Sequence, residues 1–471
     1  MANDDILWDL WDEQPPLPPH VDPVEQHFQA LKSGIHQRMV ESLDLSRIGE
    51  IDRQVLVRHV RTLANQASRD RGESLSQIDQ ERLLDELMWE VFGLGPLEPL
   101  MRDARVTDIL VNDPYTVYAE RGGQMELTDI IFADDKHLMR IIQRIVAKLG
   151  RRIDAVSPMV DARLPDGSRI NAIVPPLALD GPTLSIRRFG TEALRIDDLV
   201  RNETLISDMV RFMSAAVEAR IGCLISGGTG AGKTTLLNTL SSFVPLEERI
   251  VTIEDSAELI LQHRHRVRLE TRPPNTEGAG EVTQRDLVRN SLRMRPDRIL
   301  VGEVRGAEVW DMLQAMNTGH EGSMTTIHSN SAIDALSRLE MMAAMTGYEL
   351  PINVIRNYVA AGIKLVFHVS RLKGGPRKLV QILEIDGVAD GQYNVHEIFG
   401  FEQTSIDKRG RAVGHFYASG YRPKVIDRIT AYGIELPDDM FDEGKRYPDE
   451  GQPTPQRKQG DQSDAAELII N

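Results

Sequence analysis

A glycine-rich segment that ends in lysine and threonine carries the clearest chemical signal in the sequence. Residues 227–234 read Gly-Gly-Thr-Gly-Ala-Gly-Lys-Thr, follow an apolar run at 222–226 and precede a helix-like stretch at 233–240, which together match the phosphate-loop pattern. In such a loop backbone N–H groups surround phosphates, Lys233 reaches the terminal phosphates and the Thr234 hydroxyl ligates magnesium. We therefore expect ATP and Mg²⁺ to bind here. The predicted nucleotide-binding residues are Gly227, Gly228, Thr229, Gly230, Ala231, Gly232, Lys233, Thr234 and Thr235.

Carboxylates follow two further apolar runs. Glu303 comes directly after residues 298–302, Arg-Ile-Leu-Val-Gly, and Glu254 and Asp255 come after 249–253, Arg-Ile-Val-Thr-Ile. An acid at the carboxyl end of a parallel strand can lie beside magnesium and the attacking water. Glu303 and Glu254 are therefore catalytic candidates, and Thr234, Glu303 and Asp255 are candidate magnesium ligands, partly through water. The pattern leaves open which carboxylate is the base.

Two histidines, His320 and His328, lie in a polar, glycine-bearing segment after the run at 298–301. Lone histidines are usually structural, but a loop at this place in the chain could touch the γ-phosphate, which favours a sensing role for His328 and leaves His320 evenly balanced. No third histidine or cysteine stands at ligand spacing, so a zinc site is not expected.

The elements that must position these residues can be read from apolar periodicity. Strand-like and helical runs alternate from about 195 to 372, which is typical of a parallel sheet covered by helices, and strand candidates at 377–385 and 412–417 and a helix at 425–432 follow. Short apolar stretches at 108–111, 116–118 and 169–174 accompany a helix at 137–149 and predict a smaller α/β domain. The predicted parts are an acidic, proline-rich disordered tail at 1–28, a helical unit at 29–92, the N-terminal α/β domain at 93–190, an ATPase domain with C-terminal strands at 195–436 and a disordered tail at 440–471.

Composition restricts the class of function. The chain of 471 residues has a formal charge of -16, which disfavours a nucleic-acid partner because such binding depends on neutralising phosphates. The arginines at 285, 289, 293 and 295 recur beside apolar residues as on a helix with one charged face. We interpret them, with the basic run at 263–272, as a solvated or subunit-contact face. One cysteine, Cys223, and the lack of a signal peptide or an apolar span of about 20 residues predict a cytosolic protein with at most a peripheral membrane role. Trp8 and Trp11 leave open whether the N-terminal tail is merely solvated or docks on a partner.

Arg169 and Arg187 lie outside the predicted ATPase domain. In oligomeric ATPases an arginine from another structural element often completes hydrolysis at the terminal phosphate. Position in the sequence alone does not distinguish this role from that of a surface charge.

With these segments in order, the chain resembles the type II/type IV secretion ATPase superfamily, and most closely the CpaF branch that powers assembly of tight-adherence (Flp) pili. The resemblance runs from about 90 to 436. Its carriers are 93–98, 106–112, 158–169, the phosphate loop, 252–255, 269–274, 302–305 and 318–328.

This resemblance implies an N-terminal α/β domain joined to a RecA-like ATPase domain, assembled as a homohexamer in the cytoplasm at the inner face of the inner membrane. It implies an ATP hydrolase that drives pilus assembly through inner-membrane platform proteins and handles pilin indirectly. Residues 252–255 are similar to the family's Asp box, Glu303 to its Walker B glutamate and His328 to its principal histidine. Arg169 and Arg187 are then candidates for arginines that reach the nucleotide from the N-terminal domain.

Two departures and the competing functions complete the sequence-based interpretation. Asp113 stands where the branch usually has glycine, and the cysteine-rich zinc module of some type II relatives is missing. The main alternative is a conjugation-type or effector-exporting type IV secretion ATPase, against which the strand-rich region at 373–434 favours pili. A nucleic-acid translocase and a regulatory ring without useful turnover are further alternatives.

Overall fold

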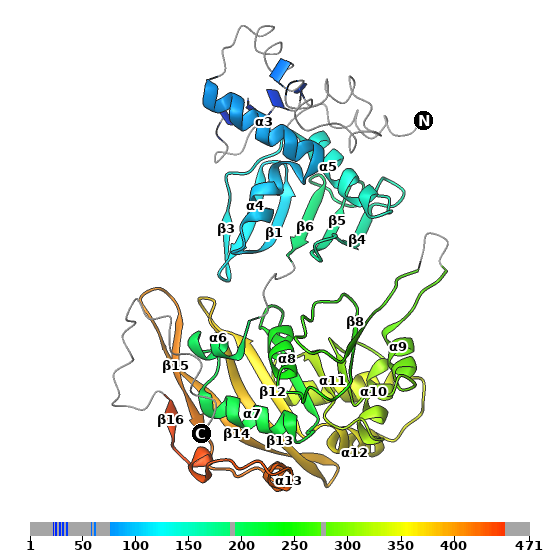
Figure 1. Cartoon of the computed structure of the whole chain (residues 1–471), viewed down its shortest axis with the longest axis vertical. Helices are drawn as coiled ribbons and strands as arrows, with labels where there is room; N and C mark the ends of the chain where they lie inside the picture. The colour runs from blue at the N-terminus through cyan, green and yellow to red at the C-terminus, as the bar shows by residue number, and fades with distance from the viewer. Residues whose placement is uncertain are drawn as a thin grey trace. The chain divides into compact units, whose positions relative to one another are not determined.

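The computed structural model describes residues 22, 24–25, 28–29, 31–32, 34–35, 58, 61–62 and 76–447, apart from 189–193 and 275–278. The chain divides into two compact units, Met1–Thr191 and Glu192–Asn471 (Figure 1). Both predicted tails, with Trp8 and Trp11, lie outside the described residues, except for a few positions at their inner ends. The finer domain boundaries stay predictions.

The first unit contains one antiparallel sheet of six strands in the order β3-β2-β1-β6-β5-β4. Its elements are α3 (Gln77–Phe92), η4 (Gly95–Leu97), α4 (Glu98–Arg102), β1 (Val106–Asp113), β2 (Thr116–Arg121), β3 (Gln124–Leu127), α5 (Asp135–Lys148), β4 (Met159–Arg163), β5 (Arg169–Ile173) and β6 (Thr183–Arg187).

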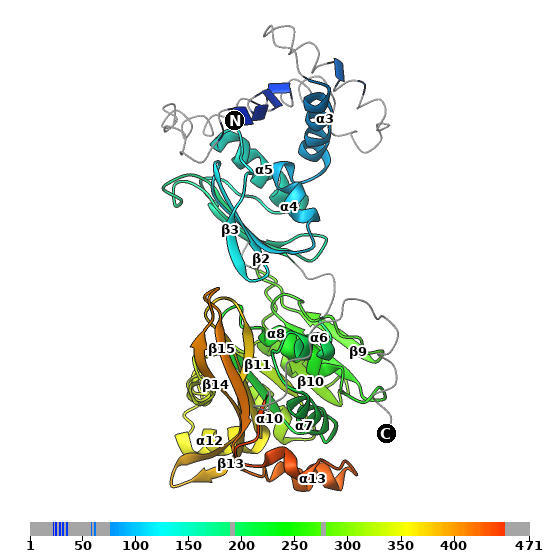
Figure 2. The same ribbon diagram turned by 90° about the vertical axis from the view of Figure 1, so that its left-hand side faces the viewer.

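Helix α5 covers this sheet (Figure 2). The helix begins where the Asp134 side chain accepts a hydrogen bond of 2.6 Å from the His137 backbone N–H, which satisfies a donor that the first turn would leave unpaired. Alternate residues of β5 and β6, such as Ile170 and Ile186, point into the same core as the apolar face of α5. Since side chains alternate along a strand, Arg169 and Arg187 lie on the other face of the sheet.

The second unit contains a sheet of ten strands in the order β16-β15-β14-β13-β12-β7-β11-β10-β8-β9. Its elements are α6 (Ile196–Arg201), α7 (Ser207–Glu218), β7 (Cys223–Gly227), α8 (Lys233–Ser241), β8 (Ile250–Glu254), β9 (Arg266–Glu270), α9 (Gln284–Ser291), β10 (Arg298–Val301), α10 (Glu308–Asn317), β11 (Met324–His328), α11 (Ala332–Ala344), α12 (Ile352–Gly362), β12 (Leu365–Arg371), β13 (Arg377–Ala389), β14 (Gln392–Ile406), β15 (Ala412–Ala418), α13 (Val425–Ala431), η5 (Asp438–Phe441) and β16 (Arg446–Tyr447).

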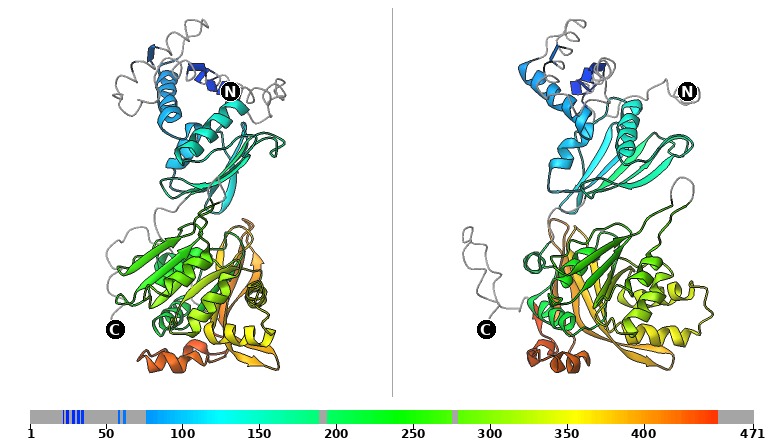
Figure 3. Two further views of the ribbon diagram at one scale, coloured as in Figure 1. Left: turned by 90° about the vertical axis from the view of Figure 1, so that its right-hand side faces the viewer. Right: turned by 45° about the vertical axis from the view of Figure 1, so that its right-hand side comes forward.

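The sheet is parallel from β12 to β9 and antiparallel from β12 to β16 (Figure 3). Strands β7, β8 and β10 are buried along their whole length, as expected for parallel strands covered on both faces. Helices α7, α8 and α13 share one core with the sheet and helices α9 to α12 share the other. The predicted α/β fold class, with a parallel sheet that carries helices, is confirmed.

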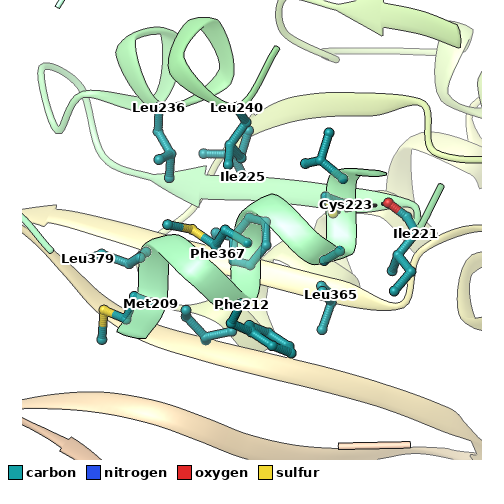
Figure 4. Packing of buried hydrophobic residues seen from close by; sticks show 14 of the residues in the cluster. Met209, Phe212, Ile221, Cys223, Ile225, Leu236, Leu240, Leu365, Phe367 and Leu379 are labelled. Carbon is teal, nitrogen blue, oxygen red and sulfur yellow. Dashed lines mark hydrogen bonds between the residues drawn. The ribbon is translucent and has the colours of Figure 1, made fainter. Parts of the chain in front are cut away.

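Figure 4 shows the first of these cores, where Leu236 and Leu240 of α8 pack over Ile225 of β7 and Phe367 of β12. Cys223 lies in this core, and its thiol donates a hydrogen bond of 3.1 Å to the Ile221 carbonyl. Burial raises the pKa of the Cys223 thiol to about 12, so the cysteine is an apolar core residue without reactivity at neutral pH.

Three local predictions differ from the structure. The segment that contains His328 was expected to be a loop, but 324–328 form the strand β11, because its threonines are buried between β7 and β10. Helix α9 ends at Ser291, and Arg295 has a φ of 54°, so the expected charged face does not continue to Arg293 and Arg295. The long strand β14 was not predicted, because only one short part of it is buried.

No helix in the described part of the chain is long and apolar enough to cross a membrane.

Candidate nucleotide-binding and catalytic site

The phosphate loop connects the end of β7 to the start of α8. Gly230 and Gly232 have φ values of 68° and 102°, which side-chain-bearing residues rarely adopt. A β-carbon on Gly227 would lie 2.3 Å from the Val369 carbonyl oxygen, so this position also requires glycine. The loop therefore turns tightly and leaves the N-terminus of α8, with Lys233 and Thr234, at the carboxyl edge of the sheet.

A chain of polar contacts joins Lys233 to the two neighbouring strand ends. The Lys233 ammonium donates to the Gly228 carbonyl at 3.0 Å and lies 3.2 Å from Nδ1 of His328, the last residue of β11. Nε2 of His328 lies 3.0 Å from a carboxylate oxygen of Glu303, which follows β10. The other carboxylate oxygen of Glu303 accepts from Arg305 at 2.7 Å, and Arg305 lies 3.5 Å from Asp255 after β8.

The surroundings of His328 favour the neutral form of its imidazole. Burial and the adjacent Lys233 ammonium lower the pKa of His328, while Glu303 opposes them. The Lys233 ammonium lies almost equally far from the two ring nitrogens, 3.2 Å from Nδ1 and 3.3 Å from Nε2. In the neutral tautomer that carries Nε2–H, Nδ1 can accept from the lysine while Nε2–H donates to Glu303. One side chain thus connects the lysine of the phosphate loop to the carboxylate at the end of β10.

Glu254, the last residue of β8, is nearly fully buried and has a different environment. One of its carboxylate oxygens accepts from the backbone N–H groups of Glu258 and Leu259, both at 2.8 Å. Its other oxygen is buried and has no hydrogen-bond partner among the described residues. Burial raises the pKa of Glu254 to about 7, against the two N–H donors and Arg268, which lower it. Glu254 touches Gly302, whose β-carbon would lie 2.9 Å from it, so it packs directly behind Glu303.

The donors at this edge fit a magnesium ion that is held mainly by phosphate and water. Within the described ranges no group of three or more His, Cys, Asp or Glu side chains is arranged to hold a metal ion. Mg²⁺ prefers hard oxygen ligands and usually takes only one or two from protein side chains beside substrate phosphates. The Thr234 hydroxyl and the carboxylates of Glu303 and Asp255 are of this kind. Bound there, the ion would neutralise charge on the phosphates.

A cleft of about 490 Å³ opens beside the loop and His328. Helix α11 forms its far wall with polar and charged side chains. The cleft is lined by Gly228, Thr229, His328, Ser329, Asn330, Asp334, Ser337, Arg338 and Met341. All nine residues belong to the second unit, so this unit provides a recess next to the predicted phosphate site.

One predicted residue of the second unit lies away from this edge, and two predicted residues belong to the first unit. His320 precedes β11 and therefore lies at the opposite edge of the sheet from His328. Arg169 and Arg187 are in the first unit, directly opposite each other on β5 and β6. Sequence reasoning gave no role to Arg305, which contacts both Glu303 and Asp255. Its position two residues after Glu303 was the available signal, because a turn after a strand end returns the side chain toward the same edge.

Comparisons with known proteins show the family of this chain. Residues 90–372 match the family described as Type II/IV secretion system protein. The chain is 41% identical over 302 residues to a putative conjugal transfer protein of Mycobacterium tuberculosis, covering 63% of this chain and 85% of that protein. It is 30% identical over 305 residues to the type IV secretion system protein VirB11 of Brucella suis, covering 59% of this chain and 84% of that protein.

The chain is also similar to solved structures. The VirB11 ATPase of the Brucella suis type IV secretion system, in complex with sulphate, is 28% identical with a TM-score of 0.34 and covers 61% of this chain and 95% of that one. The pilus retraction motor PilT with bound ADP is 19% identical with a TM-score of 0.45, covering 64% and 82%. The residues that match the family span most of the described part of both units. The two units are a smaller α/β domain and, after it in the chain, a domain with a RecA-like P-loop ATPase fold. The chain therefore belongs to the type II/IV secretion system protein family.

Proposed function

We propose that this protein is a magnesium-dependent ATP hydrolase that couples hydrolysis to export across the bacterial envelope. The observation that carries the proposal is the contact chain from Lys233 through His328 to Glu303 at the carboxyl edge of the parallel strands. A protein that only binds nucleotide needs the lysine, but it does not need a carboxylate connected to it through a neutral histidine.

Each group has a task in this proposal. Lys233 and the N–H groups of the loop bind the β- and γ-phosphates, and Glu303 orients the attacking water. When phosphate attracts the Lys233 ammonium, His328 moves with the lysine. This movement changes the hydrogen bond between His328 and Glu303. Arg169 and Arg187 are proposed as a further source of positive charge for the terminal phosphate in an assembled homohexamer.

Purified protein tests the chemistry directly. We expect magnesium-dependent ATP turnover, which Lys233→Ala abolishes together with tight nucleotide binding. Glu303→Gln should keep binding and lose turnover, because Gln retains the side-chain shape but removes the charge. Equal loss of binding in both variants would show that Glu303 does not have the proposed role. Light scattering with and without a non-hydrolysable ATP analogue measures whether a hexamer forms.

The proposed cargo has two forms. A conjugation-type or effector-exporting type IV secretion ATPase is the better supported form, because the relatives carry the names conjugal transfer protein and type IV secretion system protein. Assembly of tight-adherence (Flp) pili, as in the CpaF branch, is supported by the resemblance of the strand-rich region at 373–434. In both forms we propose that the protein acts in the cytoplasm at the inner face of the inner membrane, on platform proteins.

A deletion strain distinguishes the two forms. Loss of plasmid transfer or of secreted effector proteins, with surface fibres intact, supports the conjugation-type form. Loss of surface pili, with transfer intact, supports pilus assembly. Complementation with the wild-type chain should restore the lost phenotype and Lys233→Ala should not, which ties the phenotype to ATP turnover.

A further inference from the structure

A β-hairpin far from the phosphate loop in the sequence lies directly against it. Strand β12 runs parallel to β7, and Val369 pairs with Gly227, the first residue of the loop. Two residues later β12 ends at Arg371, which pairs with Arg377 at the start of β13. Because β12 extends past the end of β7, the turn at 371–377 is carried to the side of the phosphate loop.

Two arginines of this hairpin approach the loop. Nε–H of Arg377 donates a hydrogen bond of 2.9 Å to the Gly230 carbonyl. A β-carbon on Gly230 would lie 3.7 Å from a terminal nitrogen of Arg371, and one on Gly232 would lie 3.7 Å from Cδ of Arg377. Both side chains therefore lie against the two glycines whose positive φ values shape the loop.

The Arg377 contact fixes the direction of one peptide plane. In a trans peptide the carbonyl and the following N–H point to opposite sides, so the arginine that holds the Gly230 carbonyl directs the Ala231 N–H away from itself. That N–H donates to the Gly228 carbonyl at 3.4 Å, the same oxygen that accepts from Lys233 at 3.0 Å. The arginine thus fixes the orientation of the peptide between Gly230 and Ala231, which lies in the part of the loop that would surround a phosphate.

The hairpin is a firm support for this contact. Within it the Leu372 N–H donates to the Pro376 carbonyl at 2.7 Å. Leu379, two residues after Arg377, packs in the core that also contains Leu236 of α8 (Figure 4). The Ala412 N–H donates to the Lys373 carbonyl at 2.9 Å, which attaches the turn to the start of β15.

We propose that Arg377 is a positioning residue for the phosphate loop and that Arg371 adds positive charge to the same nucleotide site. The hairpin 371–377 is then a second support of the ATP site, formed by the same chain. This inference rests on the proposed function, because the nucleotide that the loop would hold is ATP.

Five variants test the inference in the full-length protein. They are Arg377→Gln, Arg377→Lys, Arg371→Gln, Arg371→Lys and the control Lys373→Gln, which removes an exposed cation from the same turn. The affinity is measured by titration with a fluorescent ATP analogue, and kcat and KM are measured from ATP turnover. A thermal midpoint without nucleotide reports whether each variant is folded.

We expect Arg377→Gln to raise Kd and KM about tenfold, as for loss of a hydrogen bond from a charged donor, with kcat changed less than about threefold. Arg377→Lys should not restore the affinity, because lysine cannot reproduce a donor at Nε. Arg371→Gln should weaken binding several-fold and Arg371→Lys should restore most of it, because charge is sufficient there. Lys373→Gln should equal the wild type.

Wild-type affinity for both Gln variants, or an equal loss in Lys373→Gln, would overturn the inference, and so would full affinity in Arg377→Lys. If Arg377→Gln lowers the thermal midpoint by several degrees, Arg371→Gln decides, since Arg371 is exposed. Failure of the proposed function is seen separately, as absence of ATP binding and turnover in the wild type.

Discussion

Glu254 should make the stability of the second unit depend on pH in an unusual direction. In the folded protein burial raises the pKa of Glu254 to about 7, from an ordinary value of 4.5. Between these values the folded state holds the proton and the unfolded state releases it. The free energy of unfolding therefore falls as pH rises through this window, whereas most carboxylates in folded proteins have the opposite effect.

The magnitude follows from the two pKa values. At 1.36 kcal/mol per pH unit, their difference corresponds to about 3 kcal/mol of stability that is present below pH 4.5 and lost above pH 7. Glu254→Gln imitates the protonated carboxyl, since its carbonyl oxygen can still accept from the N–H groups of Glu258 and Leu259. The variant and the wild type should therefore be about equally stable at pH 4, below this window.

The assay is the thermal midpoint of both proteins, without nucleotide or magnesium, from pH 4 to 8.5. At pH 8 we expect Glu254→Gln to melt roughly 5–10 °C above the wild type, from about 3 kcal/mol in a unit of this size. Taking the difference between the two proteins removes the contribution of every other group. Glu247→Gln is the matched control, because Glu247 is an exposed glutamate in the same unit.

Parallel pH profiles for the wild type and Glu254→Gln would refute this reasoning, and so would a wild type that is the more stable of the two at pH 8. Either result would mean that groups other than Arg268 and the two N–H donors stabilise the ionised form of the buried carboxylate.

The remaining predictions concern burial, close contact and the contact chain. Arg298→Met should lower the free energy of unfolding in urea by about 3–5 kcal/mol, because Arg298 is fully buried and donates a hydrogen bond of 2.5 Å to Glu248. Adding Glu248→Gln should restore part of this free energy. Strictly additive effects of the two substitutions would contradict the prediction. Gly222→Ala should lower the thermal midpoint by the equivalent of about 1–3 kcal/mol, because the added β-carbon would lie 2.0 Å from the Gly362 carbonyl oxygen. An unchanged midpoint would show that the backbone segments at Gly222 and Gly362 can separate without cost. His328→Asn should reduce kcat by roughly 10–100-fold, as for loss of hydrogen bonds to charged groups. In the wild type kcat should decrease with falling pH only below pH 6.5, because the pKa of the imidazole is lowered, and the variant should lack this decrease. An unchanged kcat in the variant would exclude the contact chain from turnover.

Much of the fold could be predicted from local patterns. The helix expected at 137–149 is α5, and the apolar runs at 222–226, 249–253 and 298–301 are β7, β8 and β10. The three strand segments are mostly apolar, because both faces of a central parallel strand are buried. Strand β11 was not predicted, because its threonines and histidine give it a polar sequence. These residues are buried by neighbouring strands, which the local sequence does not reveal.

The sequence predicted only those site residues whose location follows from their place at the end of a strand. Residues at the carboxyl ends of parallel strands meet at one edge, so the approach of Glu303 and His328 to Lys233 follows from the fold. Other contacts depend on how strands are ordered across the sheet. Arg377 reaches the phosphate loop from 147 positions away because β12 pairs with β7, a pairing that no local pattern indicates.

The change of strand direction at β12 has a consequence for shortened forms of this protein. The family match ends at residue 372, directly after β12, yet β13 pairs with β12 along its whole length, from Leu365 to Arg371. A chain cut at 372 would leave an almost fully buried, apolar strand with one row of unpaired N–H and C=O groups. Such an edge is a template for pairing between copies, so we expect that shortened chain to aggregate, while a chain that ends after β16 stays dispersed.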